Sequence, residues 1–242
     1  MFPQLLKAYT EFGYSVHCGN NSCFCATIID TDGIEAQIGG GISVSDIAFF
    51  FGLASIYQPD RILAIGNAFG YGSCCLAEIF RKATIDVIDA EVEGEFNKGG
   101  SELTRKISSR YYDDRINLQT GSSPDDLGRC FEQCKYDLIF IDGDHTNEQQ
   151  LKDYYGIQPF ANQSCVVYLH DVELMNIQES YEIIKNNQDG FKCYNIDFTT
   201  FGCKALVRDN EEVESWFKTI DQSPNKDYRN PIPTLRAYEL IR

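Results

Sequence analysis

The sequence predicts an α/β protein with a doubly wound, mostly parallel sheet of seven strands and an N-terminal helical and loop extension. The stretch RILAIGNAFGYGS, residues 61–73, reads as a short apolar strand, a glycine turn and the start of a helix. From there, apolar runs alternate with helical segments at the lengths that βαβ units need. The last two strand candidates, 192–198 and 203–208, lie only four residues apart, so one of them should run antiparallel.

Local patterns predict each element in turn. Residues 1–15 carry Leu5, Leu6, Tyr9 and Phe12 on one helical face, and a strand is expected over 24–29. Ser43 or Ser45 can cap a helix over 47–57, which Pro59 stops. The other expected strands are 62–66, 84–89, 115–120, 136–141 and 164–169, and the other expected helices are 72–82, 97–110, 124–133, 146–155 and 174–187.

These elements divide the chain into three parts. Residues 1–60 are expected to cover the substrate, and residues 61–209 to form the cofactor-binding domain. Residues 210–242 read as one amphipathic helix and a tail. We find no internal repeat and no low-complexity tract.

Composition excludes several functional classes. The net charge of −15 argues against a nucleic-acid partner, because binding to phosphates needs clustered Lys and Arg. No run reaches the roughly 18 apolar residues of a membrane span, and no signal peptide is evident. Cys165, Cys193 and Cys203 sit in apolar runs typical of buried thiols. We therefore expect ten reduced cysteines and a cytoplasmic protein.

The segment HCGNNSCFC brings His17, Cys18, Cys23 and Cys25 within nine positions. Three thiolates and an imidazole could hold zinc, but the spacing lacks paired C-x-x-C motifs. A loop that leads into a strand is the alternative interpretation.

Polar residues follow the ends of four predicted strands, where ligands of open α/β sheets bind. The glycine turn at Gly66 indicates a nucleotide-like cofactor, and Asp89 lies at the distance expected of an acid that binds ribose hydroxyls. The strands predicted over 136–141 and 164–169 are followed by DGDH, residues 142–145, and by the pair His170-Asp171. Two of the three histidines thus join acids at neighbouring strand ends, which indicates acid–base or metal chemistry.

Together, AIGNAFGYGS, VIDAE, GSS, DLIFIDGDH and VVYLHDV resemble the class I S-adenosylmethionine-dependent methyltransferases. The resemblance covers about residues 38–208 and is greatest to small-molecule O-methyltransferases of the catechol and macrolide-sugar types. It implies a Rossmann-like sheet and an S-adenosyl-L-methionine cofactor. The implied cofactor contacts are Ile42, Ser43, Gly66, Asn67, Ala68, Phe69, Gly70, Asp89, Ala90, Ser123 and Asp142.

The resemblance also implies the chemistry. Methyl transfer to a hydroxyl of a small molecule or sugar would use His145 as general base and Asp142 beside it, and Asp142, His170 and Asp171 would bind Mg²⁺ or another divalent cation. Ala64 stands where the family often has an acid, and His170 where it has a carboxylate or amide. The sequence leaves the acceptor and a homo-oligomeric state open.

Two other functions remain alternatives. The sequence pattern of NAD(P)-dependent short-chain dehydrogenases is also present, in the glycine turn Gly66 to Gly72 and in the motif Tyr181-x-x-x-Lys185. However, some sixty residues precede the turn here, whereas that family opens with it. A non-catalytic methyltransferase-like binding protein is favoured by the two departures at Ala64 and His170.

Overall fold

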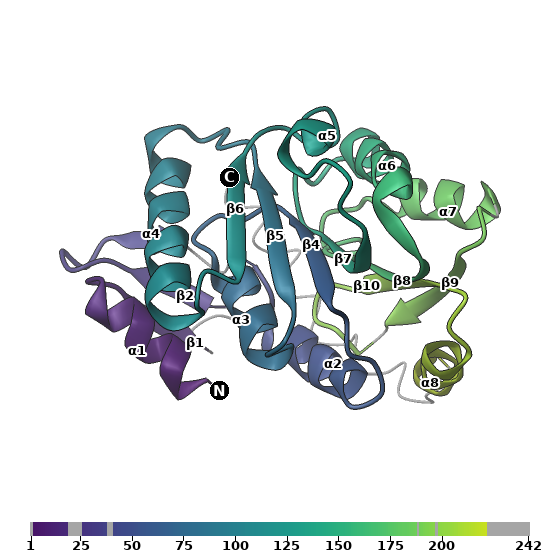
Figure 1. Ribbon diagram of the computed structural model, residues 1–242, viewed down its shortest axis with the longest axis horizontal. Helices are drawn as coiled ribbons and strands as arrows, with labels where there is room; N and C mark the ends of the chain where they lie inside the picture. Colours follow the sequence, from purple (N-terminus) through teal and green to yellow (C-terminus); the bar gives the residue numbers. More distant parts are fainter. Residues whose placement is uncertain (1, 19–25, 38–40, 188, 197, 222–242) are drawn as a thin grey trace.

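A seven-stranded sheet forms the centre of the computed structural model, which describes residues 2–18, 26–37, 41–187, 189–196 and 198–221 (Figure 1). The strand order is β6-β5-β4-β7-β8-β10-β9. Strands β4 to β8 pair in parallel, whereas β10 runs antiparallel to both β8 and β9. The predicted mostly parallel sheet with an antiparallel strand near its end is confirmed.

The sheet has seven strands, of which the outer β6 and β9 are more polar than the central ones. The seven strands are β4 (Arg61–Ile65), β5 (Thr84–Asp89), β6 (Ile116–Thr120), β7 (Tyr136–Ile141), β8 (Ala161–Leu169), β9 (Lys192–Ile196) and β10 (Cys203–Arg208). The central strands β4, β5, β7 and β8 are buried on both faces, which explains their nearly continuous apolar sequences.

Helices cover both faces of the sheet. They are α1 (Pro3–Glu11), α2 (Val44–Ala54), α3 (Tyr71–Ile79), α4 (Glu95–Tyr111), α5 (Leu127–Cys130), α6 (Asn147–Gly156), α7 (Gln178–Asn187) and α8 (Glu211–Asp221). A short 3₁₀ turn, Gln158–Phe160, precedes β8. None of the helices in the described ranges combines the length and the apolar character that a membrane span requires.

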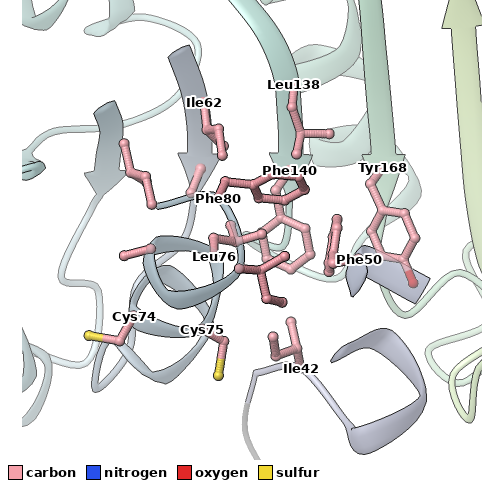
Figure 2. Close-up of a cluster of buried hydrophobic side chains, with 14 of the residues drawn as sticks. Ile42, Phe50, Ile62, Cys74, Cys75, Leu76, Phe80, Leu138, Phe140 and Tyr168 are labelled. Atoms are coloured by element: carbon pink, nitrogen blue, oxygen red, sulfur yellow. The ribbon is translucent and has the colours of Figure 1, made fainter. Parts of the chain in front are cut away.

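Two apolar cores follow from the alternation of side chains along the strands. One packs α1, α2, α3, α4 and α8 against one face of the sheet, and the other packs α5, α6 and α7 against the opposite face. In the first core, Phe50 of α2 lies against Phe140 of β7 and Tyr168 of β8 (Figure 2). Helix α2 is therefore anchored on the sheet itself.

The N-terminal extension holds more strand than the sequence indicates. Strands β1 (Ser15–Cys18), β2 (Ala26–Ile29) and β3 (Glu35–Gln37) form a separate antiparallel sheet. The expected strand over 24–29 corresponds to β2, but β1 and β3 are only four and three residues long. Segments this short show no clear alternation of apolar and polar residues, so their sequences cannot be distinguished from those of loops.

Helices α5 and α7 begin three and four residues later than predicted. Helix α5 has four residues instead of the ten expected over 124–133, because residues 122–126 form a turn in which the Ser122 N–H bonds to Asp126. Helix α7 begins at Gln178 rather than 174, because residues 171–177 form turns, including the bond from the Ile177 N–H to the Val172 carbonyl.

The seven cysteines with described side chains are all free thiols, as expected. Burial raises the pKa of Cys165 to about 12 and that of Cys193 to about 11, so both thiols stay neutral at physiological pH. Cys23 and Cys25 of the zinc hypothesis lie outside the described residues, as do Gly39, Gly40 and the predicted tail after residue 221.

Candidate active site

A cavity of about 780 Å³ opens at the carboxyl ends of the parallel strands. The loops after β4, β5, β7 and β8 contribute Gly66, Asp89, Asp142 and Asp171 to its wall, and Gly41 joins them from the N-terminal segment. The other predicted residues in the wall are Asn67, Ala68, Ala90, Ser123 and His145. The structure thus brings together most of the site residues that the sequence indicates.

The glycine turn after β4 has a conformation that its sequence explains. Gly66 has φ of 95°, and a Cβ atom there would collide with the carbonyl group of Asp142. Gly70 (φ 76°) forms the N-cap of α3 and faces Thr104. Gly100 of α4 packs directly on the carbonyl of Ala68. The turn is therefore clamped between β7 and α4, with its backbone close to the cavity.

Asp89 holds this turn from the end of β5. Its Oδ2 accepts hydrogen bonds from the N–H groups of Asn67 (2.7 Å) and Ala68 (3.3 Å), and its Oδ1 accepts one from Glu91 N–H (2.7 Å). A carboxylate has about four acceptor positions, so one remains for a ligand hydroxyl. Asp89 therefore has a structural role in addition to the predicted ribose contact.

Acids and imidazoles that follow β7 and β8 form one cluster at the cavity. Asp142 Oδ1 lies 2.9 Å from His170 Nδ1 and 3.4 Å from His145 Nε2. Asp171 contacts the same two rings, with distances of 3.1 Å to His170 Nδ1 and 3.2 Å to His145 Nε2. His145 is part-exposed to the cavity, whereas His170 lies buried behind Asp142.

The protonation of this cluster follows from its charges. Burial acts to raise the pKa of Asp142, but the imidazoles of His170 and His145 outweigh burial and hold that pKa well below its usual range. Burial acts to lower the pKa of His145 and of His170, yet the carboxylates of Asp142 and Asp171 raise both, that of His170 strongly.

These residues fit a divalent cation. One donor atom each from Asp142, His170 and Asp171 lies within 4.8 Å of the others. Asp171 Oδ1 is buried and makes no well-aligned hydrogen bond among the described residues, although His170 Nδ1 lies 3.1 Å away. A bound cation would satisfy such a buried carboxylate oxygen.

The structure adds site residues that the sequence did not single out. Asp46 of α2 reaches the far side of His170, with 3.4 Å between its Oδ2 and Nε2. Asp153 of α6 lines the cavity and accepts a hydrogen bond from Gln149 Nε2 (2.9 Å). Burial raises the pKa of Asp153 to about 6. Each acid looks like an ordinary helix residue in the sequence.

Some predicted residues do not reach the cavity wall. Ile42, Ser43, Phe69 and Gly70 are buried in the packing around it. Of the two possible caps, Ser43 and Ser45, the structure has Ser43 as the N-cap of α2.

Two further motifs lie away from the wall. Tyr181 and Lys185 sit together on α7, with Lys185 Nζ 5.9 Å from the ring of Tyr181, so the dehydrogenase alternative has no catalytic pair in the cavity. His17, from the zinc hypothesis, is exposed and bonds to Ser15 Oγ at 3.1 Å.

Comparison with known proteins agrees with this geometry. Residues 63–172 match a family model described as a methyltransferase domain. No curated protein matches the chain.

Solved structures with the same fold include the O-methyltransferase TomG from Streptomyces achromogenes, which is involved in tomaymycin synthesis and was solved with S-adenosylmethionine. It has a TM-score of 0.59 and 17% identity, with 86% of this chain and 91% of that chain covered. An O-methyltransferase from Bacillus cereus, solved with S-adenosylhomocysteine, has a TM-score of 0.57 and 19% identity, with 69% and 83% covered. The methyltransferase PaMTH1 from Podospora anserina, also bound to S-adenosylhomocysteine, has a TM-score of 0.56 and 16% identity, with 69% and 78% covered.

Proposed function

We propose that the chain is an S-adenosylmethionine-dependent O-methyltransferase acting on a hydroxyl group of a small molecule, since residues 63–172 match a family model described as a methyltransferase domain and solved O-methyltransferases share the fold. The observation that carries this proposal is one cavity lined both by the glycine turn with Asp89 and by Asp142, His145 and Asp171. The turn and Asp89 suit an adenosine cofactor, and the other three residues suit removal of a proton from an acceptor.

S-adenosylmethionine supplies, when bound, a methyl group on a positively charged sulfur. The backbone at Gly66 to Ala68 comes close to the ligand, and the remaining acceptor position of Asp89 takes a ribose hydroxyl. Asn67, Ala90 and Ser123 line the same cavity. The clamped turn orients the cofactor toward the acid and imidazole cluster, and such positioning supplies much of the rate in group transfer.

His145 takes the proton of the acceptor hydroxyl, because it is the imidazole that the cavity exposes. Asp142, His170 and Asp171 would hold a divalent cation, which would supply positive charge for a developing oxyanion. His145 Nε2 lies 3.4 Å from Asp142 Oδ1 and 3.2 Å from Asp171 Oδ2, and these carboxylates favour its protonated form when no cation is bound.

Calorimetric titration with S-adenosylmethionine and S-adenosylhomocysteine tests the proposal. We expect both to bind, and Asp89→Ala to weaken binding about 10- to 100-fold, since hydrogen bonds to a charged group contribute about 1.5–3 kcal/mol each. Asp32→Ala, which removes an exposed acid outside the cavity wall, is the charge-matched control. Preferential binding of NAD, or unchanged affinity in a folded Asp89→Ala protein, would contradict the proposal.

A further inference from the structure

Asp46 is a buried carboxylate fixed from several directions. It lies in the first turn of α2 and has no exposed surface. Its Oδ2 accepts hydrogen bonds from Ser43 N–H (2.8 Å) and Ser43 Oγ (2.6 Å), and its Oδ1 accepts one from the Tyr168 hydroxyl (2.6 Å). Since Tyr168 belongs to β8 and packs beside Phe50 of α2 (Figure 2), these bonds tie the start of α2 to the sheet.

Helix capping does not account for all of these contacts. A capping box needs only the exchange between Ser43 and Asp46, and surface helices make it in water. Here the same carboxylate is buried and faces an imidazole, with His170 Nε2 3.4 Å from Oδ2. Burying a carboxylate is costly unless a cation or several donors satisfy it. The position of Asp46 therefore indicates a role toward His170.

His170 lies between two sets of acids. Its Nε2 faces Asp46, and its Nδ1 faces Asp142 (2.9 Å) and Asp171 (3.1 Å) at the cavity. The rings of Phe140 and Phe201 flank it, with centroids 5.6 and 5.0 Å from the imidazole centroid. These aromatic neighbours limit rotation of the ring, so each nitrogen keeps its own partner.

We propose that Asp46 is the positioning residue of a carboxylate–histidine–metal triad: it holds the proton of His170 on Nε2, so that Nδ1, with Asp142 and Asp171, ligates a divalent transition metal. This inference rests on the cation site of the proposed function. Metal-ligating histidines usually donate their other ring N–H to a carboxylate or carbonyl, which fixes the tautomer and the ring orientation.

The opposite arrangement, with the metal on the Nε2 side, is disfavoured. Asp46, His170 and Cys203 also lie close enough to share an ion. However, both oxygens of Asp46 already accept hydrogen bonds, and the Cys203 thiol points at Oδ1 from 3.4 Å. The polar atoms on the Nε2 side are thus already hydrogen-bonded, whereas Asp171 Oδ1 on the Nδ1 side makes no well-aligned hydrogen bond among the described residues and lies 3.1 Å from Nδ1.

The donor set selects the class of metal. Mg²⁺ and Ca²⁺ prefer ligands made only of oxygen, whereas one imidazole with two carboxylates suits Mn²⁺, Fe²⁺, Co²⁺ or Zn²⁺. His170 is thus the residue that shifts the site from magnesium to a transition metal. Because Mn²⁺ avoids thiols, it is the appropriate probe for a chain with ten cysteines.

Calorimetric titration of the full chain with Mn²⁺ and with Mg²⁺, in the absence of cofactor, tests this inference. We expect tighter binding of Mn²⁺, and Asp46→Asn should weaken Mn²⁺ binding about 10- to 100-fold. Tyr168→Phe is the matched control, because it removes a hydrogen bond to the same carboxylate but keeps the contact between Asp46 and His170. Its Mn²⁺ affinity should stay close to that of the wild type.

A second measurement needs no variant. The chain has three histidines, so ¹⁵N-histidine labelling gives a simple spectrum. With Zn²⁺ bound, His170 should show a protonated Nε2 and a metal-bound Nδ1. A proton on Nδ1, equal affinity for Mg²⁺ and Mn²⁺, or unchanged Mn²⁺ affinity in folded Asp46→Asn would overturn the inference. Titration with S-adenosylmethionine is a separate measurement, so failure here can be distinguished from failure of the proposed function.

Discussion

At the scale of single residues, His145 is the group whose removal should affect chemistry most. Its ring reaches Asp142 and Asp171 and is part-exposed to the cavity. We expect His145→Ala to lower turnover about 10²- to 10⁴-fold, the usual contribution of a general base, while the affinity for S-adenosylmethionine stays nearly unchanged. His17→Ala, at an exposed histidine on β1, is the control. Full activity in His145→Ala would remove the assignment of the base.

Asp153 should make stability depend on pH. Its pKa of about 6 in the folded protein lies above the value of about 4 expected in the unfolded chain. Its contribution to stability is therefore greatest below pH 4 and is lost as the pH rises through 6. Asp153→Asn should raise the unfolding free energy at pH 8 by up to about 3 kcal/mol, from 1.36 kcal/mol per pKa unit.

Urea denaturation at pH 5 and pH 8 measures this effect. The difference between wild type and Asp153→Asn should be smaller at pH 5, where the wild-type carboxyl is mostly protonated. Gln149 can still donate a hydrogen bond to the amide oxygen, so the substitution keeps the contact that it makes at 2.9 Å. An equal difference at both pH values would show that titration of Asp153 does not cause it.

Site residues at strand ends could be predicted from the sequence, whereas the residues that contact them from other elements could not. Asp142, His145 and Asp171 follow apolar strands, and the topology of parallel sheets brings such positions together. Asp46 reads locally as the third residue after an N-cap serine, and the structure confirms that reading. Its contact with His170, 124 positions along the chain, depends on how α2 packs on the sheet, which no local pattern encodes.

At the scale of elements, two neighbouring glycines of α4 provide a matched pair. A Cβ on Gly99 would meet no atom within 4 Å, whereas one on Gly100 would collide with the carbonyl of Ala68 in the glycine turn. Gly99→Ala should stabilise the protein by about 0.5–1 kcal/mol, because alanine favours the helix. Gly100→Ala should destabilise it by about 1–3 kcal/mol through overpacking.

The same pair tests whether α4 positions the cofactor turn. Thermal unfolding and titration with S-adenosylhomocysteine should be measured on both variants. We expect Gly100→Ala alone to weaken binding, since it displaces Ala68. Equal stability of the two variants would contradict the packing of α4 against the turn.

The direction of a strand could be predicted where the connection to its neighbour is short. The short connection between β9 and β10 excluded a crossover helix, and β10 is indeed antiparallel. Prediction from the sequence failed for β3, whose three residues, Glu35 to Gln37, have no apolar alternation and depend on pairing with β2. It also failed for α5, where a turn ending at Asp126 replaces the first part of the expected helix.

At the scale of the whole molecule, acidic charge is concentrated at the cavity. Six carboxyl groups line it, from Asp89, Glu93, Asp142, Asp144, Asp153 and Asp171. No Lys or Arg stands in this wall within the part of the chain that the structure describes. Nearby Arg129 forms an ion pair with Asp126 at 3.1 Å. With a net charge of −15, the protein should repel anionic ligands and attract cationic ones, among them the sulfonium cofactor.

This charge distribution predicts which acceptors the enzyme prefers. Three probes that share a catechol ring and differ only in side-chain charge are 3,4-dihydroxyphenylacetate, its methyl ester and 3,4-dihydroxyphenethylamine. We expect kcat/KM to increase from the anion to the ester to the amine, with about 10-fold or more between the two ends, as electrostatic steering commonly provides. Added salt should narrow the range, because it screens exposed charges.

A pair of variants tests whether the carboxylates of the cavity cause the preference for the amine over the anion. Glu93→Gln removes an exposed carboxylate from the wall, whereas Glu132→Gln removes one elsewhere on the surface. Only the first should reduce the preference for the amine over the anion, because Glu93 borders the cavity and acts on the ligand at shorter range than Glu132, which lies outside the wall. A preference for the anionic probe in the wild-type chain would refute the expected acceptor charge, while leaving cofactor binding and the role of His145 unaffected.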